Sequence, residues 1–247
     1  MRGSDSAFLC TLTRIGGPSL SQVVMLNRPS DRASGAEESL RRAFPGAQVE
    51  TIACDLQSFA SVKKAAEEMA AKLGEVGLDA LVNNAGVMAL ADIATGDGYD
   101  VQMQTNHLSH FLLTREVWPL LEKAAEVRGE ARVVNHSSLA RMGKVLDARY
   151  LERNGGALGG NGNSMLFGGA RWLRYHQTKL ANVVFTLALA DKVAAAGTSK
   201  IVIACAAPGL AATNLQVQLL CGRLAQGAMR SRRGARRRSN AWDLSCR

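Results

Sequence analysis

The feature that most constrains the fold is a regular alternation between short apolar runs and longer segments of helical period. It begins at Gln22 and continues to Ala206. The apolar runs are rich in β-branched residues, which is typical of buried strands, and the segments between them are long enough to cross back over a sheet. This repetition predicts an α/β domain with a parallel sheet wrapped by helices. The expected strands are 23–26, 49–54, 80–83, 132–135 and 201–206.

Two of the intervening helices have an apolar stripe with i, i+3, i+4, i+7 spacing, and both stripes are expected to cover the sheet. By contrast, the stretch from Arg153 to Gly169 is rich in glycine and follows neither period, which predicts a mobile insertion. The first stripe is Val62, Ala65, Ala66, Met69, Ala70 and Leu73, and the second is Leu180, Val183, Val184, Leu187 and Ala188.

The net charge of +9 belongs to one end of the chain. The segment from Leu219 to Arg247 holds eight arginines and one acid, Asp243, so it supplies seven of those charges. A chain of 247 residues, 47% of them hydrophobic, is expected to form one domain. We place one folded domain over residues 1–217 and an arginine-rich, disordered tail over 218–247. Binding of the tail to nucleic acid or to acidic surfaces is an alternative that we disfavour.

Cysteine usage and hydropathy restrict the compartment. The five cysteines are odd in number, scattered and without CxxC or Cys/His spacing, so neither a disulfide framework nor a metal site is indicated. The N-terminal apolar run from Ala7 to Leu12 is too short for a signal peptide, and no run approaches the roughly 20 residues that span a bilayer. These features predict the cytoplasm or an organelle stroma. They leave the oligomeric state open, a homo-oligomer included.

Four short segments bring polar groups to the ends or the middle of the expected elements. A strand runs into a turn at Ala80–Gly86 with paired asparagines, Asn106 falls inside a helix, Val133–Ser138 ends a strand in two hydroxyls, and Tyr175 and Lys179 share a helix face. Each segment alone has a structural explanation, as a strand end, a surface residue or a helix cap. Their order along the chain is what suggests chemistry.

Five motifs follow one another between residues 83 and 214, in the order NNAG, NHLSHFLLT, VVNHSS, YxxxK and PGLAATN. This series resembles the short-chain dehydrogenase/reductase family, and NHLSHFLLT with Asn27-Arg28 looks most like its retinol dehydrogenase and protochlorophyllide reductase branch. The resemblance covers about residues 22–217 and implies a Rossmann-type, doubly wound parallel sheet. It also implies an NADP(H)- or NAD(H)-dependent enzyme that interconverts a carbonyl and an alcohol on a hydrophobic small molecule.

The resemblance implies four catalytic residues. Tyr175 would exchange a proton with the substrate oxygen, and Ser138, the second serine of its pair, would hydrogen-bond that oxygen. Lys179 would stabilise the phenolate of Tyr175 and so lower its pKa from about 10. Asn106 would position a water molecule that relays the proton to solvent through Lys179.

The resemblance also implies a cofactor site. It places Asp55 near the adenine, Asn84, Ala85 and Gly86 along the adenosine ribose, and Pro208, Gly209 and Thr213 near the nicotinamide, beside Tyr175 and Lys179. Arg28 follows the first expected strand, where it can pair with a ribose 2′-phosphate, so NADP(H) is favoured over NAD(H). The alternative for Arg28 is an ordinary solvated arginine.

The family pattern is incomplete at both ends. A strand and a TGxxxGxG turn should precede Val23, but no three glycines there have this spacing, although Gly16 and Gly17 stand together. The missing strand is central in the family order 3-2-1-4-5-6-7. Ala7–Thr13 could fill that place, although the connection to Val23 is too short for a parallel crossover, so an antiparallel substitute or a shifted sheet is expected. The chain therefore looks like an incomplete reading of a longer gene. A truncated, catalytically inactive member of the fold is the alternative function.

Overall fold

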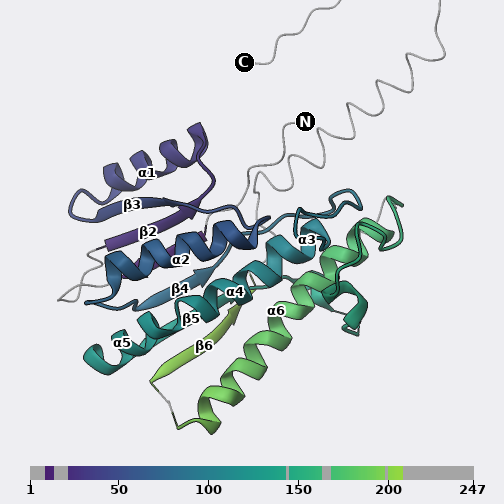
Figure 1. The fold of residues 1–247 in the computed structure, drawn as a ribbon. Helices are drawn as coiled ribbons and strands as arrows, with labels where there is room; N and C mark the ends of the chain where they lie inside the picture. Colours follow the sequence, from purple (N-terminus) through teal and green to yellow (C-terminus); the bar gives the residue numbers. More distant parts are fainter. Residues whose placement is uncertain (1–8, 14–21, 143–144, 163–167, 198–199, 208–247) are drawn as a thin grey trace, which may run out of the picture. The chain divides into compact units, whose positions relative to one another are not determined.

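The protein is described by a computed structural model, which covers residues 9–13, 22–142, 145–162, 168–197 and 200–207. These residues belong to a compact unit, Met1–Leu210, and a second unit, Ala211–Arg247, lies outside the described residues. Six described strands form one sheet in the order β3-β2-β1-β4-β5-β6 (Figure 1). They are β1 (Leu9–Thr13), β2 (Gln22–Asn27), β3 (Gln48–Ala53), β4 (Ala80–Asn83), β5 (Ala131–His136) and β6 (Ile201–Ala206).

The five strands predicted from the sequence are all present, within one residue or two of the expected bounds. β2 pairs with β3, β4 with β5, and β5 with β6, each time in parallel. The α/β Rossmann-type fold is thereby confirmed.

The central position of the sheet is filled by β1, which runs antiparallel to both of its neighbours. Leu9 pairs with Leu26 and Thr13 with Gln22 on one side, and Cys10 pairs with Val82 on the other. The antiparallel substitute expected for Ala7–Thr13 is thus confirmed. Because Thr13 lies beside the first residue of β2, β1 ends at the edge of the sheet opposite the carboxyl ends of β2 and β4. Gly16 and Gly17 lie outside the described residues.

The helices begin and end where local chemistry favours it. Ser30 and Ser58 cap two of them by accepting from the backbone N–H of Ala33 and Ser61, and Gly129 ends another with a φ of 89°. The helical elements are α1 (Asp31–Ala43), α2 (Phe59–Leu73), α3 (Val101–Met103), a π-helical turn (Gln104–Leu108), α4 (Ser109–Glu116), α5 (Trp118–Arg128), two 3₁₀ turns (Leu139–Arg141 and Ala148–Leu151) and α6 (Ala170–Ala195). No helix among the described residues is long and apolar enough to cross a membrane.

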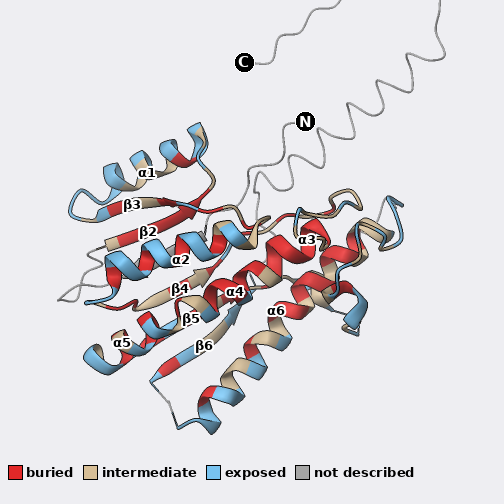
Figure 2. Cartoon of the chain, in the orientation of Figure 1, coloured by how far each residue is buried: buried red, intermediate tan, exposed pale blue. Residues whose placement is uncertain are grey.

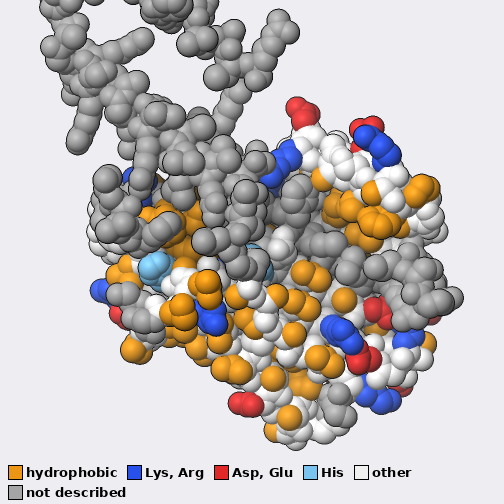
Figure 3. All heavy atoms as spheres, turned by 180° about the vertical axis from the view of Figure 1, so that it is seen from behind, with side chains coloured by type: hydrophobic (Ala, Val, Ile, Leu, Met, Phe, Trp, Pro, Cys, Tyr) orange, Lys and Arg blue, Asp and Glu red, His pale blue; other side chains and the backbone are white. Residues whose placement is uncertain are grey.

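The two faces of the sheet are covered unequally. One face carries the main core, in which Val24 and Leu81 pack with α2, α4 and α5, while on the other face Leu40 of α1 packs on Met25. Beyond β2 and β3, no described helix covers this second face, and Val202 of β6 is 41% exposed. Figure 3, seen from behind, shows hydrophobic side chains spread over this side of the molecule. The described sheet is thus doubly wound only at its β2–β3 end.

The stripe predicted for α6 is wrong. Val184 and Leu187 are 43% and 61% exposed, whereas the buried side of the helix carries polar residues. Figure 2 shows buried residues concentrated in the N-terminal half of α6. Hydrogen bonds to distant segments, described below, account for this reversal. The stripe of α2 is confirmed except for Ala70, which is exposed. The buried polar residues of α6 are Arg174, Tyr175, Gln177, Thr178, Lys179, Asn182 and Thr186.

The glycine-rich stretch is held by hydrogen bonds over residues 153–162, the longer of its two described parts. The backbone N–H groups of Leu158 and Gly160 donate to Asp92 Oδ2 at 2.9 and 2.6 Å, and those of Asn154 and Gly155 donate to Gly98 O. The mobile insertion expected here is, in this part, a loop fixed to the segment that follows β4.

Candidate active site

The candidate site lies at the carboxyl ends of β4 and β5, where α6 crosses them. In open α/β sheets this edge is where ligands bind, because loops leave the parallel strands there together. The edge carries Asn84–Gly86 after β4 and Ser137 and Ser138 after β5. α6 contacts β5, β6 and the 3₁₀ turn that follows Ser138. The motifs singled out in the sequence are therefore brought together in space.

Tyr175 and Ser138 face one another. Tyr175 is 5% exposed, and its phenol is hydrogen-bonded to the side chain of Ser138. Ser137 points the other way: it is fully buried, and its hydroxyl donates to the backbone oxygen of Lys179 at 2.7 Å. The two neighbouring serines thus have separate partners, and only the second one meets the phenol.

The electrostatics of Tyr175 differ from the sequence expectation. Burial raises the pKa of the Tyr175 phenol, and the hydrogen bond from Ser138 only partly opposes this. Lys179 Nζ lies 5.7 Å from the centre of the Tyr175 ring and donates to His136 O at 3.2 Å. The net direction of the phenol pKa is therefore upward, opposite to the expected lowering, and the interaction that opposes it comes from Ser138 rather than from Lys179. Burial also lowers the pKa of Lys179, to about 8.

Asn106 lies in the π-helical turn and joins the loop after β4 to α6. Its Oδ1 accepts from the backbone N–H of Val87 at 2.7 Å, and its Nδ2 donates to Val87 O at 2.8 Å and to Thr178 Oγ1 at 2.9 Å. π-Helical turns occur frequently at functional sites. A Cβ on Gly86 would lie 3.4 Å from both Asn106 Oδ1 and Lys179 Nζ, so the absence of a side chain lets this loop approach both residues.

Known proteins share this arrangement of sequence and fold. The profile described as short chain dehydrogenase matches residues 19–150. The chain belongs to the short-chain dehydrogenase family. It is 30% identical over 224 residues to the Short-chain dehydrogenase TIC 32 A, chloroplastic, of Brassica napus, covering 86% of this chain and 63% of that protein. It is 31% identical to human Retinol dehydrogenase 13, covering 83% and 54% of the two chains.

A solved structure shows the same likeness. An uncharacterised protein from Mycobacterium paratuberculosis is 34% identical, with a TM-score of 0.58, covering 78% of this chain and 60% of that one. These relatives confirm the short-chain dehydrogenase family of oxidoreductases and its retinol-dehydrogenase-like branch. The chain spans less than two thirds of the length of each of them.

In this member of the family, the first asparagine of the NNAG segment is structural. Asn83 is buried and donates to Thr114 Oγ1 at 3.0 Å and to Asn135 Oδ1 at 2.8 Å. Asn135 in turn donates to Thr186 Oγ1 at 3.0 Å. This row of four buried polar side chains joins α4, β4, β5 and α6 beneath the site. An asparagine inside each of two apolar strands was the sequence signal for it.

Arg174, which the sequence analysis missed, connects three segments around the site. Its guanidinium is fully buried, donates to Gly160 O at 2.8 Å and to Leu90 O at 3.0 Å, and lies 3.2 Å from Asp100 Oδ2. Asp92 Oδ2 is 3.7 Å away. Burial raises the pKa of Asp100 to about 6, although Arg174 and two backbone N–H groups oppose it. The arginine next to Tyr175 thus fixes both the glycine-rich loop and the start of α3.

The cofactor residues predicted for the adenosine side lie at one edge of the sheet. Arg28 follows β2 and is half-buried, and Asp55 follows β3 and accepts from the backbone N–H of Gln57 at 2.9 Å. Asn84 follows β4 and is exposed, and Ala85 beside it is buried. These positions fit the adenosine half of a dinucleotide.

The pyrophosphate part of the dinucleotide fits less well. Because β1 ends at the opposite edge, no glycine-rich turn stands among the described residues at the carboxyl ends of β2 and β4. Pro208, Gly209 and Thr213, expected near the nicotinamide, lie outside the described residues.

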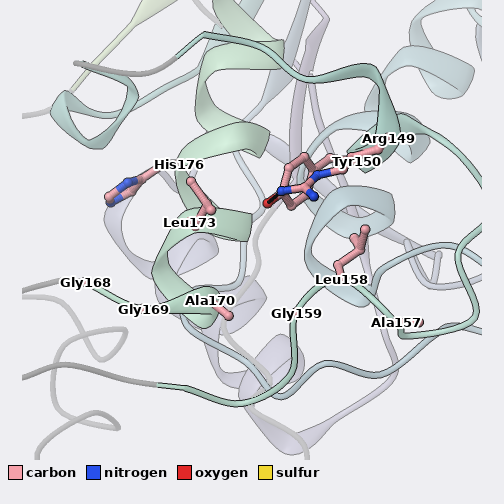
Figure 4. Close-up of a pocket in the computed structure, with 10 residues that line it drawn as sticks. All are labelled: Arg149, Tyr150, Ala157, Leu158, Gly159, Gly168, Gly169, Ala170, Leu173 and His176. Atoms are coloured by element: carbon pink, nitrogen blue, oxygen red, sulfur yellow. Dashed lines mark hydrogen bonds between the residues drawn. The ribbon is translucent and has the colours of Figure 1, made fainter.

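A cavity of about 490 Å³ opens beside the N-terminal end of α6. Figure 4 shows Tyr150 and Arg149 on one side of it and Leu173 and His176 of α6 on the other. Tyr175 is not among its lining residues. The cavity thus neighbours the site without opening onto the phenol.

Proposed function

We propose that this protein is an NADP(H)-dependent oxidoreductase that interconverts a carbonyl and an alcohol on a hydrophobic small molecule. Membership of the short-chain dehydrogenase family implies a nicotinamide cofactor and oxidoreductase chemistry. The observation that carries the proposal is the meeting of the Tyr175 phenol with the Ser138 hydroxyl, with Lys179 Nζ beside the same ring.

Each of these groups has a role at the substrate oxygen. Tyr175 gives a proton to that oxygen in reduction and takes it back in oxidation, and Ser138 hydrogen-bonds the same oxygen and holds it in place. The buried ammonium of Lys179 favours the phenolate once the proton has left. The nicotinamide, when bound, supplies or accepts the hydride. Asn106 holds the Val87 loop and α6 together, and a water molecule near it would connect Lys179 to solvent.

Arg28 supports NADP(H) over NAD(H). It follows β2, at the edge where the adenosine ribose would lie, and a guanidinium there pairs with a 2′-phosphate in two parallel hydrogen bonds. Asp55, Asn84, Ala85 and Gly86 would line the rest of the adenosine half.

The second candidate is a catalytically inactive member of the fold that does not hold cofactor. The antiparallel direction of β1 favours it, because a pyrophosphate is normally bound by backbone N–H groups in the turn after a parallel central strand.

Titration with NADPH and NADH, followed by turnover with aldehydes, ketones and a retinoid, separates the two candidates. The first predicts saturable NADPH binding and turnover that is lost in Tyr175→Phe, with an unchanged unfolding transition. No binding at millimolar cofactor would establish the second, and saturable binding without turnover would contradict both. Near-normal turnover by Tyr175→Phe would refute the role of the phenol.

We also propose that the protein is a homo-oligomer of the cytoplasm or an organelle stroma. The exposed apolar side chains of Phe111, Val184 and Leu187 on α4 and α6 support association. The name of the relative TIC 32 A, chloroplastic, supports an organelle. An arginine-rich tail over 218–247, with nucleic-acid binding as a disfavoured role, remains a prediction that concerns residues outside the described ones.

A further inference from the structure

Asn182 stands on α6 one turn after Lys179 and has no part in the family motif discussed above. Its side chain is 3% exposed. Nδ2 donates to the backbone oxygens of Asn106 and His136, both at 3.0 Å, and Oδ1 lies 3.0 Å from His107 Nδ1. Both N–H groups and the carbonyl of this one amide are therefore engaged by groups from two different segments, the π-helical turn and the end of β5.

The two backbone oxygens held by Asn182 connect it to Lys179 on one hand and to the π-helical turn on the other. His136 O, at the end of β5, is the same oxygen that accepts from Lys179 Nζ. Asn106 O belongs to the π-helical turn, and it also accepts from His110 Nδ1 at 3.0 Å. A shift of either oxygen would change the position of Lys179 relative to Asn106.

We propose that Asn182 is a positioning residue that fixes Lys179 for the reaction by joining the His136 and Asn106 carbonyls. This inference rests on the proposed function. The amide suits the task because its two N–H groups diverge, so one side chain can hold two oxygens at a set separation. His107 fixes which end of the amide faces them, since its Nδ1–H donates to Oδ1 and so leaves Nδ2 for the carbonyls.

The expected consequence of Asn182→Ala is a loss of alignment rather than of fold. Displacements of about 1 Å at a reacting group reduce rates by on the order of a hundredfold, so we expect kcat to fall between tenfold and a hundredfold. KM for the substrate should stay within about twofold, because no group that holds the substrate is removed. The alkaline limb of the pH profile should move to lower pH, because the Lys179 ammonium loses a fixed acceptor.

Thr186→Val is the matched control. Thr186 lies one turn further along the same buried side of α6 and is 5% exposed, and it bonds Asn135 and the backbone oxygen of Asn182, but it touches neither carbonyl that the Asn182 side chain holds. Both variants lose buried hydrogen bonds, so both should lower the melting temperature. Only Asn182→Ala should reduce kcat, shift the pH profile and raise the Kd for NADPH in a fluorescence titration.

The outcomes separate this inference from the function on which it rests. If the unmodified protein turns over substrate and Asn182→Ala behaves like Thr186→Val, the positioning role is overturned and the function stands. If the unmodified protein binds neither NADPH nor NADH, both are overturned. A selective loss in Asn182→Ala, with binding weakened as well, supports the inference.

Discussion

The two halves of the sheet differ in how firmly they hold the groups that a dehydrogenase needs. In the C-terminal half, β4, β5 and α6 carry Ser138, Tyr175 and Lys179 in a buried network of hydrogen bonds. In the N-terminal half, Arg28 and Asp55 stand at strand ends beside a central strand that runs the wrong way for a phosphate-binding turn. All four histidines of the chain also lie in the C-terminal half, between His107 and His176.

This difference indicates that the arrangement of the candidate catalytic residues and the binding of the cofactor have separate structural requirements. The geometry around Tyr175 needs α6, β5 and the π-helical turn, and none of these contacts depends on the direction of β1. Binding of a dinucleotide requires that the central strand end at the same edge of the sheet as Asn84, so that the turn after it can bind the pyrophosphate. One half can therefore be complete while the other is not.

The largest effect is expected from restoring the central strand. Replacing residues 1–21 by the parallel strand, TGxxxGxG turn and crossover helix of a relative should lower the Kd for NADPH by about a hundredfold to a thousandfold. Two backbone N–H bonds to a pyrophosphate, each contributing roughly 1.5–2 kcal/mol, at the low end for bonds to a charged group, give this magnitude. Calorimetric or fluorescence titration measures it.

The control is the same graft with its turn glycines replaced by alanine, which should bind no better than the original chain. If the intact graft also leaves the NADPH affinity unchanged, the contrast between the two halves does not lie in β1.

A second prediction uses the histidines of the C-terminal half. Burial lowers the pKa of His110 to about 3 and that of His136 to about 4. As pH falls below about 6.5 the unfolded chain takes up protons that the folded chain refuses, so the free energy of unfolding should fall, with His110 alone contributing on the order of 3 kcal/mol by pH 4. Asp100 acts in the opposite direction between pH 6 and 4, because its pKa is raised to about 6. One carboxyl does not offset both histidines.

Urea unfolding at several pH values between 7 and 4 measures this loss. His110→Asn keeps a donor for Asn106 O and removes the titration, so its stability should depend less steeply on pH. An equally steep dependence in this variant would show that the acid sensitivity comes from elsewhere.

How much of each half could be predicted from the sequence depends on how far apart in the chain the interacting residues lie. The strands could be predicted because each is signalled by a run of β-branched residues that are adjacent in the sequence. The shared helix face of Tyr175 and Lys179 could also be predicted, because it depends only on their spacing of four residues. The buried side of α6 was not, because its polar residues find partners far away in the chain: Asn106 and Thr178 are 72 positions apart. Arg174 was missed for the same reason, since Asp92 and Asp100 come from a distant loop. The hydrophobic pattern of α6 predicted that its apolar side is buried, whereas hydrogen bonds to distant segments bury its polar side instead.

The serine pair tests the C-terminal half at a finer level. Ser138→Ala should reduce kcat by about a hundredfold with little change in stability, because it removes one hydrogen bond to the reacting oxygen. Ser137→Ala should instead lower the free energy of unfolding by about 1–3 kcal/mol, because it leaves the Lys179 carbonyl without its buried donor. Steady-state kinetics and urea unfolding of both variants measure these effects. If Ser137→Ala lost activity and Ser138→Ala lost stability instead, the roles assigned to the two serines would be reversed.

The smallest effect is expected at Arg28, in the N-terminal half. Arg28→Ala should weaken NADPH binding by about tenfold and leave NADH binding unchanged, because only NADPH carries the 2′-phosphate that a guanidinium binds. This loss of NADPH affinity is small for a hydrogen bond between charged groups, because Arg28 is partly exposed and solvent screens its charge. Arg32→Ala is the matched control, because Arg32 is an exposed arginine of α1 with the same charge. If the two variants weaken NADPH equally, general charge and not a phosphate contact sets the preference, and the N-terminal half then contributes no specific recognition of the cofactor.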